Sequence, residues 1–326
     1  TAKYILVATG GAPNHGRSIP GIEHVISSNE VFHLPALPKR ILIQGGGYIA
    51  LEFAQMYRRF GAAVTVVEKG PRLTSREDED VSAAIKDILE AEGITVVLDA
   101  TDMRIAKHEN GIALQPRADA DPVVGSHLLV ATGRRPNTDD LGLETAGVRT
   151  DGRGYVVVDD RLRTTADGVW AMGDCNGKGA FTHTSYNDFE IVAANLLDDD
   201  PRRVSDRVTT YALYIDPPLG RAGMTEDEVR RSGRKALVGK RPMTRVGRAV
   251  EKGETQGFMK VVVDAETEEI LGAAILGVGG DEVIHCILDV MTAKLPYTAI
   301  SRTMHIHPTV SELVPTMLQD LRPLDN

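Results

Sequence analysis

A run of three glycines, Gly45, Gly46 and Gly47, follows the apolar stretch 41–43 after a single residue, and the small residue Ala50 stands three positions later. This spacing fits the pattern G-x-G-x-x-G/A. In that pattern Gly45 makes a tight turn, Gly47 lets the backbone approach a pyrophosphate, and Ala50 lets the helix pack closely on the sheet. The helix N-terminus would offer unpaired N–H groups to the phosphates. Glycine-rich turns that bind no ligand can have the same motif. The elements on either side therefore decide whether the motif indicates a binding site.

Glu68 ends the next apolar stretch, 64–67, about 20 residues after the glycines, where an acid binds an adenosine ribose 2′-hydroxyl. With a strand before the motif and a helix after it, we predict a dinucleotide site. A carboxylate at this position repels a 2′-phosphate, which favours NAD over NADP. Two alternatives remain open: Glu68 is a solvent-facing acid at a strand end, or the neighbouring Lys69 and Arg72 accept a phosphate.

The elements around this motif predict an α/β fold. Residues 41–69 have the pattern strand, helix, strand, which indicates a parallel sheet. A second helix is expected to open at Ser75 and to run through Val81, Ile85 and Leu89 to a stop at Gly93, with the strand ITVVL after it. Two further βαβ-like pieces are expected to flank this block. They end in the near-identical strands KYILVATG, at the start of the chain, and SHLLVATG, at 126–133.

The pattern changes after about residue 205. The stretches TYALYI, KALVGK, MKVVVD and ILGAAIL alternate with turns and helices but lack regular crossover helices, which predicts an antiparallel sheet. Thr225 and Glu228 form an expected capping box, and Gly233 closes that helix. The charged, proline-containing segment 198–206 is an expected domain boundary.

Composition narrows the function classes. The chain has 326 residues, 42% of them hydrophobic, which is enough for two or three domains with their own cores. The 37 basic and 46 acidic residues give a formal net charge of -9, so nucleic acid is not an expected partner. No apolar run approaches the roughly 20 residues that span a bilayer, and the N-terminus has no signal-peptide pattern. We therefore expect a cytoplasmic protein with no membrane partner.

The two cysteines do not form a recognisable motif. Cys175 and Cys286 are far apart in sequence, so neither a CxxC pair nor a zinc cluster can be written, and no metal site is predicted. Cys286 lies among apolar residues at helical spacing and is expected to be a buried helix residue rather than a reactive thiol. Cys175 follows Gly173 and Asp174 on an expected turn. A single thiol cannot store two electrons as a disulfide.

Taken together, GGGYIALEFA, the two ATG turns, AMGDC and HIHPTVSE resemble the class I pyridine nucleotide-disulfide oxidoreductases, the family of glutathione reductase, dihydrolipoyl dehydrogenase and mercuric reductase. The resemblance covers essentially the whole chain. The stretches FTHTSYNDFEIV, DPPLGRAGMTE and GGDEVIH favour the mercuric reductase-like branch and its reactive-chlorine-resistance relatives. The resemblance implies a Rossmann-like NAD(P)-binding domain at 37–120, inserted in an incomplete FAD-binding domain at 1–36 and 121–205. A C-terminal α+β dimerisation domain follows at 206–326.

The resemblance also implies cofactor contacts. Tyr48 matches the tyrosine that covers the nicotinamide pocket, and Glu52 matches a glutamate near the nicotinamide; a packing role for Tyr48 is the alternative. Asp174 matches the acid that binds a ribityl hydroxyl of FAD, although an Asp after Gly is also an ordinary turn residue. The other expected cofactor contacts are Gly133 and Arg134, at a turn between the nucleotide domains, Gly173, and Thr182, at the flavin pyrimidine end. Arg134 could equally form a surface salt bridge, and His183 replaces the proline of glutathione reductase.

His307 and Glu312, within HPTVSE, match the family's catalytic pair. The chemistry requires a base that takes a proton from a dithiol, and imidazole suits this at neutral pH. Glu312 would fix the tautomer of His307 and raise its basicity. In the family this pair reaches into the partner subunit, which implies a homodimer with the base donated in trans. His305 is expected to be a structural or surface residue.

Family members begin with a flavin-binding strand and a helix carrying CxxxxC, and neither occurs in this sequence. We expect a chain that lacks the N-terminal part of the FAD domain and is inactive by itself. In one interpretation the chain is part of an enzyme that passes hydride from NADH to FAD and then to a disulfide. The substrate of this enzyme is a small-molecule disulfide or oxidised thiol. The alternatives are a non-catalytic NAD-binding, dimerising fragment and a soluble transhydrogenase-like flavoprotein. Mercuric reductases carry a C-terminal cysteine pair that this sequence does not have.

Overall fold

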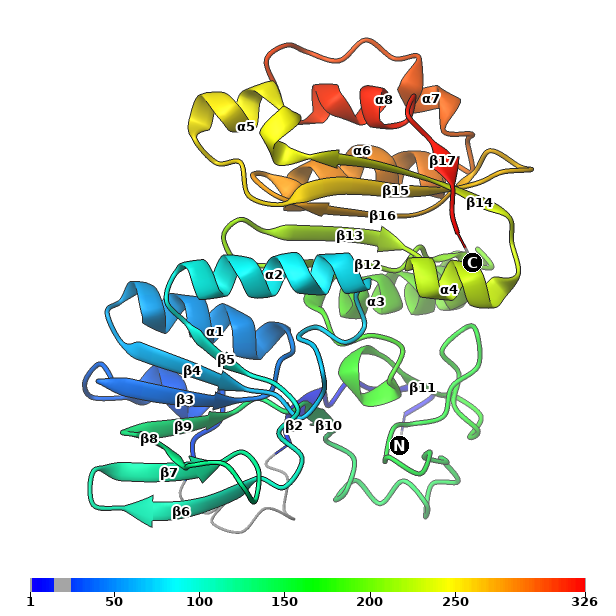
Figure 1. The fold of residues 1–326 in the computed structure, drawn as a ribbon. Coiled ribbons are helices and arrows are strands. Elements are labelled where there is room, and N and C mark those ends of the chain that lie inside the picture. Colours follow the sequence, from blue (N-terminus) through cyan, green and yellow to red (C-terminus); the bar gives the residue numbers. More distant parts are fainter. Residues whose placement is uncertain (1, 15–24, 326) are drawn as a thin grey trace. The chain divides into compact units, whose positions relative to one another are not determined.

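The structure is a computed structural model that describes residues 2–14 and 25–325. The chain forms two compact units, one of residues 1–14 with 133–207 and the other of residues 15–132 with 208–326. Figure 1 shows the elements of both units in chain order. The three-part division predicted above, with boundaries at 37, 121 and 206, stays a prediction.

The second unit contains a four-stranded sheet in the order β5-β4-β3-β9, and all its strands are parallel. This confirms the parallel sheet predicted around the glycine motif. Residues 41–44 of the inner strand β3 are buried on both faces, so the apolar residues 41–43 are consecutive, as in a parallel strand, rather than alternating with polar ones. The strands are β3 (Arg40–Gln44), β4 (Ala63–Val67), β5 (Thr95–Val97) and β9 (His127–Val130).

The two helices of this sheet are α1 (Tyr48–Arg59) and α2 (Glu79–Ala91). The apolar positions predicted for the second helix, Val81, Ile85 and Leu89, are fully buried. The expected opening at Ser75 is wrong, because the chain first makes a turn in which the backbone N–H of Glu77 bonds to the carbonyl of Thr74 at 2.7 Å. The helix begins four residues later. The acidic residues of its first turn suit the positive end of the helix dipole.

The connection from β5 to β9 is not a βαβ crossover, so that part of the prediction is wrong. It consists of β6 (Arg104–His108), β7 (Gly111–Gln115) and β8 (Val123–Gly125), which form an antiparallel sheet. Strand β7 alternates between buried and half-buried residues, as a strand covered on one face does, whereas Ile105 is the one buried residue of β6.

Six antiparallel strands in the order β12-β13-β16-β15-β14-β17 form the C-terminal sheet, as the sequence predicted. Their bounds are β12 (Thr210–Leu213), β13 (Leu219–Gly223), β14 (Ala236–Pro242), β15 (Phe258–Asp264), β16 (Ile270–Leu276) and β17 (Arg322–Pro323). The sequence did not reveal β13, because two glycines and an arginine give it no apolar pattern. The helices are α4 (Glu226–Ser232), α5 (Gly247–Lys252), α6 (Gly280–Thr292), α7 (Thr298–Ser301) and α8 (Val314–Met317).

Two local predictions in this part have clear outcomes. The capping box of α4 is confirmed: the Glu228 N–H donates to the Thr225 hydroxyl at 3.2 Å, and the Glu228 carboxylate accepts from the Thr225 N–H at 2.9 Å.

Cys286 does lie on α6, but it is half-buried rather than buried. Its thiol donates to the Val283 carbonyl, and burial together with Asp289 raises its pKa to about 11. A thiol with so high a pKa is a poor nucleophile at neutral pH.

The first unit pairs segments from both ends of its sequence. Strand β1 (Ile5–Val7) runs parallel to β11 (Val169–Ala171), and β2 (Gly11–Pro13) runs antiparallel to β10 (Arg134–Pro136). The helix α3 (Thr182–Leu197) ends at the segment 198–206 that was predicted as a boundary, and the unit itself ends at Arg207. Cys175 lies in the short helix Gly173–Asn176 and is fully buried. None of the helices in the part of the chain that is described could cross a membrane.

Candidate functional site

The glycine turn lies between β3 and α1, and each of its glycines has a different surrounding. Gly45 has φ of +117°, and a Cβ atom there would lie 2.5 Å from the carbonyl oxygen of Ala131, so any other residue is excluded. Gly47 is exposed and has extended backbone, and a Cβ atom there would meet nothing within 4 Å. Ala50 is fully buried at the packing surface of α1. The turn is tight on its inner side and open at the helix N-terminus, which is the form of a phosphate cradle.

Glu68 lies over this turn. Its side-chain Oε1 accepts a hydrogen bond from the Gly70 N–H at 2.8 Å, and its Oε2 lies 3.1 Å from where a Cβ of Gly46 would be. The guanidinium of Arg72 donates to the Ser75 carbonyl at 3.2 Å, while Lys69 is exposed. The acid is therefore held at the turn, as a ribose-binding residue must be. The preference for NAD over NADP stays a prediction.

Tyr48 is the first residue of α1 and contacts residues that the sequence gave no reason to select. Its hydroxyl donates to Oε1 of Glu77 at 3.2 Å, and its ring lies 5.3 Å from the ring of Tyr211. The pKa of Tyr48 is raised by burial and by the negative charge of Glu77. Glu52, one turn further along α1, accepts a hydrogen bond from the Tyr214 N–H at 2.9 Å, and burial raises its pKa. Both side chains therefore join the glycine-motif helix to the stretch around β12.

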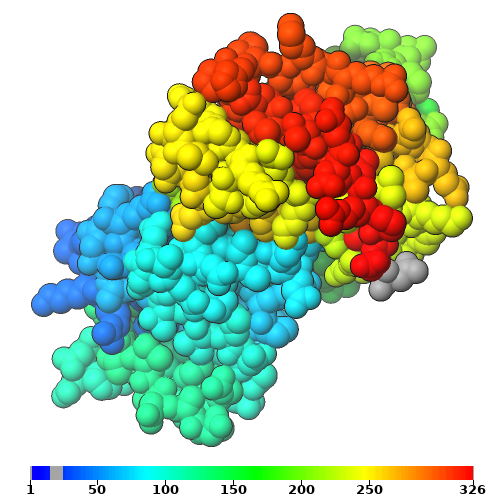
Figure 2. Space-filling view, turned by 45° about the horizontal axis from the view of Figure 1, so that its top comes forward, coloured from blue at the N-terminus to red at the C-terminus, as the bar shows by residue number. Residues whose placement is uncertain are grey.

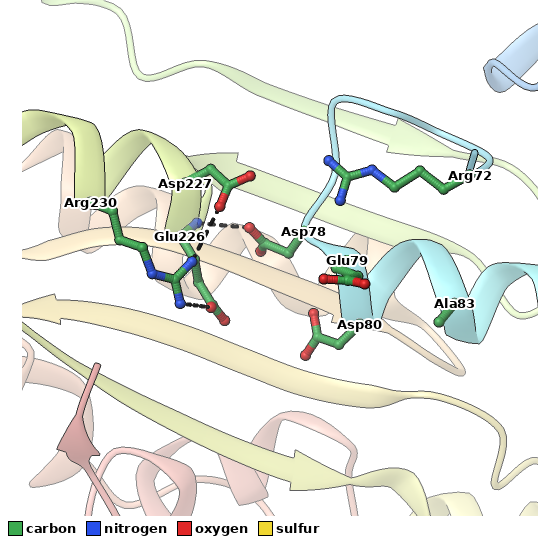
Figure 3. Close-up of a pocket in the computed structure, with 8 residues that line it drawn as sticks. All are labelled: Arg72, Asp78, Glu79, Asp80, Ala83, Glu226, Asp227 and Arg230. Atoms are coloured by element: carbon green, nitrogen blue, oxygen red, sulfur yellow. Dashed lines mark hydrogen bonds and ion pairs between the residues drawn. The ribbon is translucent and has the colours of Figure 1, made fainter. Parts of the chain in front are cut away.

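A second cluster lies at the N-terminus of α2, beside a surface hollow that Figure 3 shows. The carboxylates of Asp78, Asp80 and Glu226 converge there. The ammonium of Lys260 lies 2.9, 2.6 and 2.7 Å from them and stands where a bound cation would stand. Arg221 donates to Asp78 at 3.0 Å from β13. This is a buried ion-pair network, and sequence reasoning did not find it because its members are up to 182 residues apart.

The cofactor contacts predicted at Gly133, Arg134, Gly173, Asp174 and Thr182 lie in the first unit, where Arg134 and Asp174 meet. Asp174 forms an ion pair with Arg134 at 3.4 Å, and Arg134 also donates to the Gly11 carbonyl. Gly173 has φ of +75°, and a Cβ there would lie 2.8 Å from the Ser185 hydroxyl oxygen. Gly133 pairs with Asn14 through the backbone. Thr182 begins α3 and is exposed. The Asp174 carboxylate is thus fixed but partly exposed, which suits an acceptor for a hydroxyl.

His307 and Glu312 form the predicted pair. The His307 Nδ1 lies 2.9 Å from Oε2 of Glu312, and the imidazole is 80% exposed whereas the carboxylate is 15% exposed. A carboxylate at Nδ1 holds the proton there and leaves Nε2 available as an acceptor toward solvent. Met304 and Ile306 beside the pair are also exposed. Figure 2 shows this orange-red stretch after residue 300 at the surface.

The comparisons with known proteins agree with this geometry. Residues 1–188 match the family described as pyridine nucleotide-disulphide oxidoreductase, and residues 209–318 match the dimerisation domain of the same family. The chain belongs to the pyridine nucleotide-disulfide oxidoreductases, a family of FAD-dependent enzymes that use a nicotinamide dinucleotide.

The individual relatives are oxidoreductases of several specificities. The chain is 40% identical over 298 residues to the probable pyridine nucleotide-disulfide oxidoreductase RclA of Escherichia coli, covering 90% of this chain and 67% of the relative. It is 33% identical to a dihydrolipoyl dehydrogenase of Thermus scotoductus and 35% identical to a mercuric reductase of Streptomyces lividans, covering 95% of this chain and 68% and 66% of those proteins. A solved structure of RclA, described as an HOCl-induced flavoprotein disulfide reductase, has 37% identity and a TM-score of 0.90, covering 97% of this chain and 73% of that one. The chain thus spans about two thirds of the length of these curated relatives.

Proposed function

We propose that the chain works in a cytoplasmic, homodimeric FAD-dependent oxidoreductase of the mercuric reductase-like branch that takes hydride from NADH and reduces a small-molecule disulfide or oxidised thiol. The observation that carries the proposal is the glycine turn, where Gly47 is open to a ligand and Glu68 lies over the turn. The matched dimerisation domain supports the homodimer. RclA, described as a flavoprotein disulfide reductase, supports the reaction class.

Each candidate residue has a defined task in this proposal. The N–H groups at the start of α1 bind the pyrophosphate, and Glu68 accepts hydrogen bonds from the adenosine ribose. Tyr48 and Glu52 border the nicotinamide. Asp174 accepts a ribityl hydroxyl, with Arg134 holding its carboxylate in place. FAD, when bound, supplies two-electron transfer between a dihydronicotinamide and a disulfide.

His307 handles the proton of the thiol. Its Nε2 takes the proton when the thiolate forms, and Glu312 on Nδ1 stabilises the resulting imidazolium. The exposure of the imidazole fits a base that acts on the partner subunit. The two free cysteines are fully buried Cys175 and half-buried Cys286, whose pKa is raised. We therefore assign neither cysteine as the redox thiol.

A titration of the purified, folded protein with NADH, combined with its intact mass and visible spectrum, tests the proposal. We expect saturable NADH binding at submillimolar concentration, the absorption of oxidised flavin, and bleaching of that absorption by NADH. NADH binding without flavin or turnover would instead indicate the non-catalytic, dimerising fragment. Transfer of hydride between NADH and a nicotinamide analogue, without disulfide reduction, would indicate the transhydrogenase. Absence of NADH binding at millimolar concentration would contradict all three.

A further inference from the structure

Glu77 is a buried acid next to the dinucleotide motif that the proposed mechanism does not use. It lies in the turn between β4 and α2, and only 1% of its surface is exposed. Its Oε1 accepts hydrogen bonds from the hydroxyls of Tyr48, at 3.2 Å, and Tyr211, at 2.5 Å. One carboxylate oxygen therefore joins the first residue of α1 to strand β12.

Burial of this acid is costly, and its surroundings compensate only in part. The guanidinium of Arg221 lies 3.7 Å from Oε2 of Glu77, and that oxygen has no hydrogen-bond partner among the described residues. Desolvation by burial raises the pKa of Glu77. Glu77 also lies beside Asp78, which Arg221 holds at 3.0 Å. An apolar side chain could fill this position without the desolvation cost, so a requirement other than packing favours an acceptor here.

The two tyrosines whose hydroxyls bind Glu77 pack on each other beside the glycine turn, where α1 begins. Their rings lie 5.3 Å apart and are inclined by 37°. Tyr48 follows Gly47 directly, so its ring is attached to the backbone that would contact the pyrophosphate. A tyrosine side chain has two rotatable bonds, and the hydroxyl contact with Glu77 restricts both. The position of the ring at the turn is thus determined by a residue 29 positions away.

We propose that Glu77 is a positioning residue: by accepting hydrogen bonds from Tyr48 and Tyr211 it holds the Tyr48 ring in the orientation that receives the nicotinamide half of the dinucleotide. The inference rests on the proposed function, because it assigns Tyr48 to the nicotinamide pocket. Glu77 acts through Tyr48 and contacts no reacting atom. Its loss therefore weakens binding of the nicotinamide portion while the adenosine and pyrophosphate contacts remain.

The experiment compares NADH with ADP-ribose, which lacks the nicotinamide, in the holoenzyme. For Glu77→Leu, which removes the acceptor, we expect the Kd for NADH to rise about 10-fold, the scale of a lost hydrogen bond to a carboxylate, while the Kd for ADP-ribose changes less than about twofold. Glu77→Gln keeps an acceptor oxygen and should restore most of the NADH affinity. Glu79→Leu and Glu79→Gln are the controls, because Glu79 is an exposed acid two positions away.

A double-mutant cycle tests whether Glu77 acts through the tyrosine. Tyr48→Phe removes a single hydroxyl, so it stays informative if Glu77→Leu fails to fold. We expect Tyr48→Phe to weaken NADH binding by itself, and Glu77→Leu to have little further effect in the Tyr48→Phe background.

Three outcomes would overturn the inference. They are a normal NADH affinity for both Glu77→Leu and Tyr48→Phe, an equal loss of NADH and ADP-ribose affinity, and additive effects in the cycle. If the wild-type protein binds neither ligand, the proposed function fails together with the inference. If it binds both and the variants match it, only the inference fails.

Discussion

Gly45 and Gly47 stand two positions apart in one turn and are glycines for different reasons. A side chain at Gly45 would collide with the Ala131 carbonyl at a backbone conformation that L-residues rarely adopt. A Cβ atom at Gly47 would meet nothing within 4 Å. The fold therefore requires the first glycine, whereas the second is required only by the dinucleotide binding proposed above.

This difference gives a matched pair of variants. Gly45→Ala should lower the free energy of unfolding by about 3 kcal/mol or more, through backbone strain and steric overlap. Gly47→Ala should lower it by less than about 1 kcal/mol, the scale of a changed helix N-cap, yet raise the Kd for NADH at least about 10-fold. Denaturant unfolding and NADH titration measure the two effects. A Gly47→Ala protein that binds NADH normally would mean that the pyrophosphate does not lie at this turn.

The position of Glu68 over the turn allows a test of cofactor choice. Glu68→Arg replaces a group that repels a 2′-phosphate with one that attracts it, so the ratio of kcat/KM for NADPH over NADH should rise by about 10-fold or more. Glu109→Arg is the control for the change in net charge, because Glu109 is exposed on the turn between β6 and β7. An unchanged ratio in Glu68→Arg would show that the ribose is recognised by other residues.

The role of His307 can be separated from hydride transfer. His307→Ala in the holoenzyme should slow the dithiol-dependent step by about 100-fold, the scale of a lost general base, and leave reduction of the flavin by NADH unaffected. Stopped-flow absorbance resolves the two steps. His305→Ala is the neighbouring control, since the imidazole of His305 forms a hydrogen bond through Nδ1 with the Thr303 carbonyl. Unchanged thiol chemistry in His307→Ala would remove this residue from the mechanism.

At the scale of the elements, local chemistry decides where several helices begin and end. In the capping box of α4 the backbone N–H groups of Thr225 and Glu228 each donate to the other residue's side chain, and Gly233 ends the helix with φ of +72°. The opening of α2 was harder to predict, because a turn at Thr74 precedes its N-cap Asp78. Helix ends are therefore predictable where the capping partners are adjacent in sequence.

Removal of the α4 cap should have a modest and measurable cost. Thr225→Ala leaves the Glu228 N–H without its acceptor and should lower the free energy of unfolding by about 1 kcal/mol. Thr101→Ala, at an exposed position outside any helix, should change it by less than about 0.5 kcal/mol. Denaturant unfolding of both variants gives the comparison. Equal stability would mean that the cap contributes nothing to this helix in its tertiary setting.

At the scale of the whole molecule, an ion-pair network joins α2, beside the parallel sheet, to the antiparallel sheet within the second unit. Lys260 and Arg221 come from β15 and β13, and Asp78 and Asp80 come from the start of α2. Burial by itself would raise the pKa of each aspartate, but the charges of Lys260 and its neighbouring cations outweigh it and lower both values. Desolvation would likewise lower the pKa of Lys260, yet the carboxylates raise it.

These pKa directions determine the pH range of the stabilisation. A depressed folded-state pKa makes the aspartate contribution complete above about pH 4 and lost as the pH falls through that pKa. A raised folded-state pKa makes the lysine contribution complete below about pH 10 and lost as the pH rises through that pKa. The network therefore contributes fully at neutral pH.

Lys260→Met at pH 7 should lower the free energy of unfolding by about 3 kcal/mol or more, because it leaves buried carboxylates without their counter-charge. Lys235→Met removes an ion pair with Glu266 in which both side chains are more than 70% exposed, and should cost less than about 1 kcal/mol. Thermal or denaturant unfolding measures both. If the two variants lost equal stability, the network would not be what joins the two sheets.

Local sequence was enough to place the glycine turn between a strand and a helix, the parallel strands around it and an antiparallel C-terminal sheet. In these elements the glycine spacing, the helical period and the strand patterns all lie within a few tens of residues. Where the local pattern was weak the prediction failed: β13 was missed, and the antiparallel connection from β5 to β9 was expected to be a crossover.

Only the tertiary structure brought Glu77 between Tyr48 and Tyr211, and Lys260 among the aspartates. These contacts join residues from 29 to 182 positions apart, because residues distant in the chain meet only when whole sheets and helices pack. A buried charge has no periodicity by which a sequence could reveal its partner.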